Sequence, residues 1–152
     1  MTTHILRLMN LAFLVLALIL PAGCPDRTGG RTPETNEPAH VRLAQEFKLH
    51  VEQRATVDGD GFSLRFVSVA NDSRCPVDVT CVWAGNAEVL VEANAGGSTA
   101  SLKLNTLGGD KFPKDGKHQR YTVALVALSP LPRKDRRIKT ADYEATFVIR
   151  KE

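Results

Sequence analysis

Short runs in which apolar and polar residues alternate dominate the sequence after residue 40, and this pattern restricts the fold more than any other feature. The clearest runs are residues 47–51, 87–93, 100–104 and 143–149. Alternation with a period of two is typical of half-buried β-strands. Turn-forming residues separate the runs, and none of them has helical periodicity. The pattern predicts an all-β chain with roughly seven short strands, folded as a single antiparallel β-sandwich.

Two stretches depart from simple alternation. Within residues 62–69 the apolar positions change phase after Phe66, which predicts either a β-bulge or a strand covered on both faces. Residues 121–128 are almost continuously apolar, which indicates burial on both faces, and the prolines that follow end this strand. The runs on either side of residues 94–97 are predicted to form a hairpin. Residues 108–117 are expected to form a long polar loop.

The N-terminus has the features of an export signal that ends just before Cys24. An apolar core at residues 11–20 is shorter than the ~20 residues that a membrane-spanning helix needs. Ala22 and Gly23, the small pair before the cysteine, resemble the bacterial lipobox, in which the thiol is lipidated and the chain is cut just before it. Pro21 stands where that motif usually has leucine. The alternative is an ordinary secretory signal with an incidental cysteine.

The chain therefore divides into a lipoprotein signal peptide at residues 1–23, a lipidated cysteine with a disordered tether at residues 24–40, and one β-sandwich domain at residues 41–152. The tether lacks apolar periodicity and is rich in residues that cannot bury enough surface to become ordered. The expected location is the bacterial cell envelope, with the membrane bound through Cys24. Pro25 follows the cysteine where inner-membrane retention uses aspartate, so a Gram-negative host would place the protein in the outer membrane, facing the periplasm.

Charge and side-chain composition exclude some function classes. The 20 lysine and arginine residues fall to 19 when Arg7 leaves with the signal peptide, against 17 acidic residues, a balance that argues against nucleic acid as a partner. No arrangement of serine, histidine and acid indicates a catalytic site, and no cofactor or metal is predicted.

Cys75 and Cys81 are the two cysteines left once Cys24 is assigned to lipid. In an exported protein such a pair favours a structural disulfide. A redox pair and a zinc site are the alternatives. Thioredoxin-type chemistry uses a closer spacing, and zinc needs further ligands that are not clustered here.

Several residues around this pair are candidates for ligand contact. Trp83 is predicted to pack against the disulfide in the core, with a stacking platform for a sugar or peptide as the alternative. Asp72, Asp78 and Asp142 together suit calcium chemically, but aspartates at strand ends more often cap turns. The basic segment at residues 133–139 is expected to be a solvated loop, and contact with anionic lipid is its alternative.

The motif DSRCP at residues 72–76, followed by Cys81 and by WAG at residues 83–85, resembles a group of small, functionally uncharacterised bacterial envelope lipoproteins. That resemblance implies an exported β-rich domain with a Cys75–Cys81 disulfide, and it carries over no catalytic residue. Residues 140–145 also resemble the tyrosine corner of immunoglobulin-like domains. The sandwich is therefore expected to be immunoglobulin-like.

The function expected from the sequence is that of a lipid-anchored, non-catalytic envelope β-sandwich that binds a peptide, a glycan or a partner protein. One alternative is an envelope hydrolase that uses loop carboxylates such as Asp72 and Asp142. Another is an inhibitor-like module that acts through its loops, for example residues 108–117.

Overall fold

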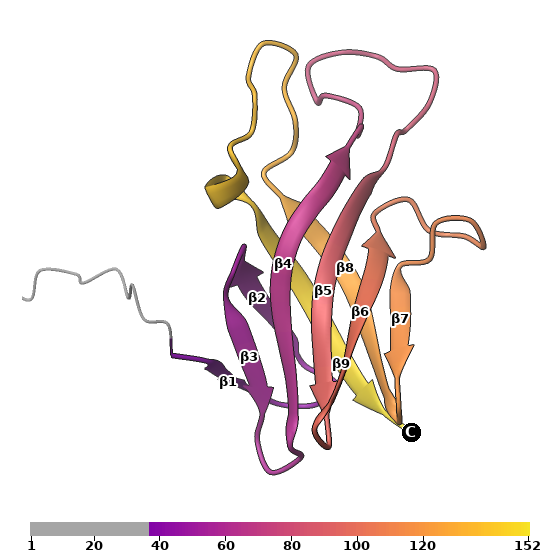
Figure 1. The fold of residues 1–152 in the computed structure, drawn as a ribbon. Helices are drawn as coiled ribbons and strands as arrows, with labels where there is room; N and C mark the ends of the chain where they lie inside the picture. Colours follow the sequence, from indigo (N-terminus) through magenta and orange to yellow (C-terminus); the bar gives the residue numbers. More distant parts are fainter. Residues whose placement is uncertain (1–36) are drawn as a thin grey trace, which may run out of the picture. The chain divides into compact units, whose positions relative to one another are not determined.

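The computed structural model describes residues 37–152, which form two packed β-sheets (Figure 1). The predicted signal peptide and the lipidation site at Cys24 lie outside the described residues. The first sheet has the strand order β1-β3-β4-β5-β6, and the second has the order β2-β9-β8-β7. The strands of the first sheet are β1 (Ala39–Val41), β3 (Arg54–Val57), β4 (Phe62–Asp72), β5 (Ala87–Ala95) and β6 (Ser98–Asn105). Those of the second are β2 (Glu46–His50), β7 (Asp115–His118), β8 (Tyr121–Ser129) and β9 (Glu144–Lys151).

The predicted β-sandwich is confirmed, with nine strands in the described residues instead of about seven. The strands that the sequence pattern missed, β1, β3 and β7, are short. β1 lies partly in the segment expected to be the tether, and it pairs in parallel with β3. β7 begins inside the predicted polar loop at residues 108–117. Strands of three or four residues contain too few positions for alternation to be recognised.

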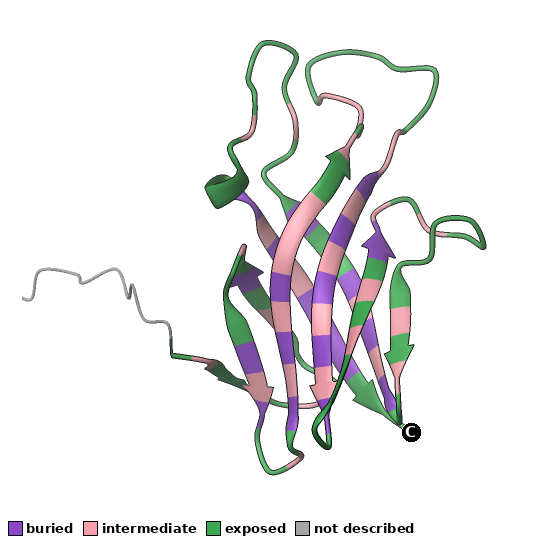
Figure 2. Ribbon diagram, in the orientation of Figure 1, coloured by how far each residue is buried: buried purple, intermediate pink, exposed green. Residues whose placement is uncertain are grey.

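The core lies between the two sheets and is built from the inward-facing residues of each strand (Figure 2). Phe62, Leu64 and Phe66, the alternating apolar residues of β4 before the phase change, are fully buried. The Phe66 ring meets Phe147 of β9 edge to face, with 5.9 Å between the ring centroids. Each fully buried side chain of this size stabilises the folded state by about 1.5–3 kcal/mol. The alternating residues of the long strands therefore hold the two sheets together.

Both long strands with irregular patterns contain bulges. β4 changes register with β5 between Phe66 and Ser68 and again between Val69 and Asn71, which confirms the bulge interpretation of the phase change. β8 changes register with β9 between Leu125 and Ala127. The prediction that β8 is covered on both faces is wrong, because a two-layer sandwich leaves one face of each sheet to solvent. Val126 is 46% exposed there.

The hairpin of β5 and β6 forms where it was predicted. The strands pair from Glu88 with Asn105 to Ala95 with Ser98, around a two-residue turn. Gly96 and Gly97 both have positive φ, at 56° and 80°. Turns of this kind match the right-handed twist of the flanking strands, and two glycines adopt them without a steric penalty.

Three connections leave the sandwich at the same end, shown at the top of Figure 1. They are the β4–β5 connection at residues 73–86, the β8–β9 connection at residues 130–143, and the β6–β7 connection at residues 106–114. We call the first the disulfide loop and the second the basic loop. The basic loop contains the short 3-10 helix η1 (Thr140–Asp142).

Candidate functional site

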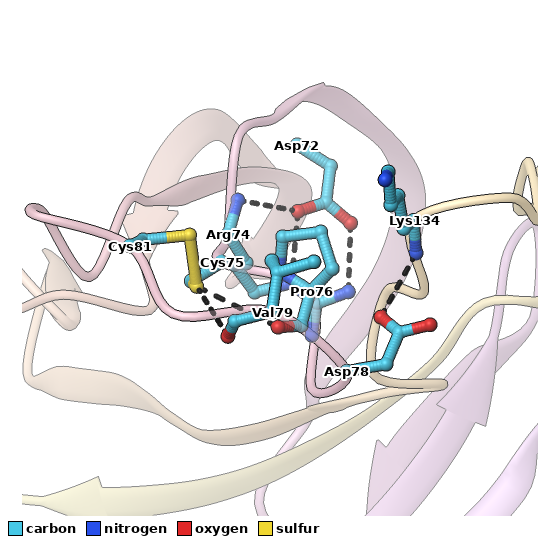
Figure 3. Close-up of a disulfide and its surroundings, with 8 residues drawn as sticks. All are labelled: Asp72, Arg74, Cys75, Pro76, Asp78, Val79, Cys81 and Lys134. Atoms are coloured by element: carbon cyan, nitrogen blue, oxygen red, sulfur yellow. Dashed lines mark hydrogen bonds and ion pairs between the residues drawn. A yellow bond between two sulfur atoms is a disulfide. The ribbon is translucent and has the colours of Figure 1, made fainter.

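The base of the disulfide loop continues the antiparallel pairing of β4 and β5 beyond the ends of both strands. The Ser73 amide donates a hydrogen bond to the Asn86 carbonyl at 2.7 Å, and the Cys75 amide donates to the Ala84 carbonyl at 2.9 Å. Cys75 and Cys81 form a disulfide with their Cα atoms 6.0 Å apart (Figure 3), as predicted. The loop is thus closed twice, by backbone hydrogen bonds at its base and by the Cys75–Cys81 disulfide farther from the strands.

Gly85 is required by this close approach of the two loop segments. Its φ is +71°, and a Cβ atom added there would lie 1.9 Å from the Ser73 carbonyl oxygen. Backbone atoms cannot move aside as a flexible side chain does, so any other residue would open the base of the loop. The close approach therefore explains why the WAG motif ends in glycine.

Arg74 ties the disulfide loop to the other sheet. Its guanidinium donates to both carboxylate oxygens of Asp72, at 2.9 and 2.7 Å. The same group donates to the carbonyl oxygens of Leu128 at 2.5 Å and Pro130 at 2.8 Å, where β8 runs into the basic loop. The Arg74 and Asp72 side chains are only 9% and 11% exposed. This paired, largely buried arginine acts as a clamp between the two loops.

Tyr143 completes the environment of the Asp72 carboxylate by donating its hydroxyl proton to Oδ2 at 3.0 Å. Partial burial pushes the pKa of Asp72 upward, but hydrogen bonds and charge from Arg74 outweigh it and hold the pKa below its usual value. Burial and the adjacent carboxylate raise the pKa of Tyr143 to about 12. The carboxylate therefore stays ionised and the phenol protonated near neutral pH. Because Tyr143 bonds a side chain and not a nearby backbone carbonyl, the resemblance to a tyrosine corner does not extend to its hydrogen bond.

The three aspartates of the calcium alternative have separate roles. Asp78 accepts a hydrogen bond from the Lys134 amide at 3.0 Å and so links the disulfide loop to the basic loop (Figure 3). Asp142 lies exposed in η1, and its carboxylate forms no hydrogen bond or ion pair within residues 37–152. Nowhere in that range do three or more His, Cys, Asp or Glu side chains gather as a metal site would require.

A second direct contact joins the loops, since the Val77 amide donates to the Pro132 carbonyl at 3.0 Å. With the Arg74 clamp and the Asp78 contact, the two loops are connected at three places. They therefore form one unit at this end of the sandwich.

Large apolar side chains point into solvent from this unit. Trp83 is 82% exposed and Val82 is 91% exposed, although side chains of this size are usually at least half buried. Val77 and Leu131 are 53% and 62% exposed, and Val79 is exposed as well. We call these five residues the apolar tip. Its members come from both loops.

The prediction that Trp83 packs in the core is wrong. In immunoglobulin domains the tryptophan meets a disulfide that joins the two sheets. Here the Cys75–Cys81 bond lies in a loop beyond the strand ends, so no core surrounds it. Within the sequence, the turn-forming residues around Trp83 were the available signal that it lies outside a strand.

A group of cationic side chains in the basic loop accompanies the apolar tip. All five are exposed, and none forms an ion pair with another residue of the described range. We call this group the basic flank; it comprises Arg133, Lys134, Arg136, Arg137 and Lys139. Together, the basic flank and the apolar tip offer both charge and apolar surface for contact with a ligand.

A hollow lies at the start of the domain. It is lined by residues of β1, β2 and the segment between them, together with Asp58. His40 and Asp58 form an exposed pair there, with 2.7 Å between His40 Nδ1 and Asp58 Oδ1. The lining contains no serine, threonine or cysteine to act as a nucleophile beside that pair.

No protein-family model, curated protein or solved structure matches this chain. Across residues 37–152, no helix has both the length and the apolar character needed to cross a membrane.

Proposed function

We propose that this protein is a lipid-anchored, non-catalytic module of the bacterial cell envelope that binds another envelope component through the apolar tip. The observation that carries the proposal is the exposure of Trp83 and Val82 at 82% and 91% on a loop closed by a disulfide. Tryptophan is enriched among the residues that contribute most to binding. A loop already fixed in shape loses little conformational entropy when it binds, which favours affinity.

The chemistry of the carboxylates supports a binding role over the hydrolase alternative. Asp72 is paired with Arg74, accepts the Tyr143 hydroxyl, and has a lowered pKa, so it is a poor general acid. Asp142 is exposed, and its carboxylate forms no hydrogen bond or ion pair with any of the described residues. Of the two acids proposed for a hydrolase, Asp72 therefore has a structural role and Asp142 lies in solvent.

The anchor part of the proposal rests on the apolar run that ends at Ala22, Gly23 and Cys24. Replacing Cys24 with serine should abolish incorporation of labelled fatty acid and block normal processing. Label in the C24S variant, or none in the parent protein, would contradict the lipoprotein assignment. Fractionation of a Gram-negative host would then test the expected outer-membrane location.

The binding part is tested by introducing a photo-crosslinking amino acid at single positions in cells. Val82, at the apolar tip, is compared with Ser98, an exposed residue in the turn region at the opposite end of β5 and β6. A discrete product from position 82 that is absent from position 98 is expected. Its identification as protein, glycan or lipid gives the ligand class. Equal products from both positions, or none from position 82, would refute binding through the tip.

A further inference from the structure

We propose that the surface bound by the apolar tip is an anionic phospholipid bilayer. Trp83 and Val82 would enter the headgroup region, while the basic flank would contact the anionic headgroups. This inference rests on the proposed function, because it assigns a ligand to the same tip. It assigns the same ligand to the apolar tip and to the basic flank, which the disulfide loop and the basic loop bring together.

The shape of the tip favours a bilayer over a partner with a fixed surface. Val82 and Trp83 are consecutive, and each is more than four-fifths exposed, so they protrude from the loop. A protruding apolar group needs either a matching pocket or a soft medium that yields around it. The interfacial region of a bilayer is such a medium, and tryptophan is enriched there because its ring is apolar while its N–H still finds a polar partner.

The charge of the tip matches an anionic surface. The basic loop has five cationic side chains against two acidic ones, Asp135 and Asp142. The cations are free of ion pairs within the described range, so no internal partner must be displaced when they meet headgroups. Basic residues close to an anionic membrane add favourable energy roughly in proportion to their number.

The connections between the loops make the apolar and basic parts act together. Val77 bonds to Pro132, and Asp78 bonds to the Lys134 amide at the start of the basic flank. Insertion of the disulfide loop therefore brings the cations toward the same surface. A tip of this kind requires neither a preformed ligand pocket nor a change of fold.

The test uses the only tryptophan in the chain as its probe. The full chain is reconstituted in phosphatidylcholine nanodiscs, so that its anchor is occupied, and is mixed with acceptor vesicles. The vesicles consist of phosphatidylcholine alone or mixed with phosphatidylglycerol. A blue shift of Trp83 emission, and its quenching by brominated acyl chains in the acceptor vesicles, is expected only with phosphatidylglycerol present. Salt should reverse it, because surface charge is screened.

Two matched variants separate charge from general effects. Arg137→Glu reverses one cation of the basic flank, and Arg120→Glu makes the same change in the turn between β7 and β8, at the other end of the domain. Arg137→Glu should weaken vesicle binding about 30-fold, as expected for reversing one charge near the surface. Arg120→Glu should leave binding unchanged. Val82→Asp, at a position that is 91% exposed, should abolish the shift while preserving the folded domain.

Three results would overturn the proposal. One is an unchanged Trp83 emission with every vesicle, and another is the same shift with and without phosphatidylglycerol. The third is equal weakening by Arg137→Glu and Arg120→Glu. If emission is unchanged but position 82 crosslinks to a single protein in cells, the binding function stands and the lipid assignment fails. If neither vesicles nor cells give a signal at the tip, both fail.

Discussion

Replacing Arg74 with alanine should be one of the most destabilising single changes at the loop end of the domain. The substitution removes two hydrogen bonds to the Asp72 carboxylate and two to the carbonyl oxygens of Leu128 and Pro130. It also leaves Asp72, whose side chain is 11% exposed, without its cationic partner. The hydrogen bonds that remain, from the Tyr143 hydroxyl and from the backbone amide of residue 74, do not neutralise that charge.

The expected loss is about 3 kcal/mol in the free energy of unfolding. Removing one partner of a buried ion pair costs about 3–5 kcal/mol, and the lower end applies because the edge of this pair still meets solvent. For a domain of this size, such a loss lowers the unfolding midpoint by roughly 10 °C. Lysine at position 74 should recover only part of it, because one ammonium group cannot reach the carboxylate and both carbonyls at once.

Thermal unfolding followed by circular dichroism measures this effect, with Arg137→Ala as the control. Arg137 is exposed and has no ion pair in the described part of the chain, so its removal should change stability by less than about 0.5 kcal/mol. If Arg74→Ala and Arg137→Ala unfold at the same temperature, Arg74 does not clamp the loops and the reasoning fails.

Other consequences of the structure are open to direct measurement. Replacing Cys75 and Cys81 with serine should lower stability by roughly 2 kcal/mol without loss of strand content, and free thiols at both positions in the non-reduced parent would contradict the disulfide. Trp83→Ala should change the unfolding free energy by no more than about 0.5 kcal/mol, since the side chain is 82% exposed; a loss of several kcal/mol would restore the core interpretation. Tyr143, whose pKa is raised to about 12, contributes stability below its ordinary pKa near 10 that is lost as pH rises toward 12. In alkaline titrations of unfolding, Tyr143→Phe should therefore lose less stability over that interval than the parent, and equal losses would count against the Asp72 contact.

The sequence predicted those parts of the fold that local patterns determine. The Gly96–Gly97 turn defined the β5–β6 hairpin, and the phase change after Phe66 located the bulge in β4. The exposure of Trp83 depends on where the disulfide lies relative to the sheets, which spacing along the chain does not specify. The partners of Arg74 could not be predicted from the sequence either, because two of them are backbone carbonyls more than fifty residues away. Contacts to backbone atoms leave no residue-type signature at the distant position.

The bulges of β4 and β8 have a consequence for self-association. On the β3 side, the backbone of β4 is hydrogen-bonded as far as Phe66, which pairs with Glu52 and Gln53. On the β7 side, the backbone of β8 is hydrogen-bonded as far as Leu125, whose amide donates to the Lys114 carbonyl. Beyond those points each strand has, within residues 37–152, a sheet neighbour on one side only, and every register shift of the two strands falls there. A straight strand with an open edge offers a row of unpaired N–H and C=O groups on which another chain can add as a further strand. Bulges interrupt that row and increase the local twist, so these open edges are poor templates for edge-to-edge aggregation.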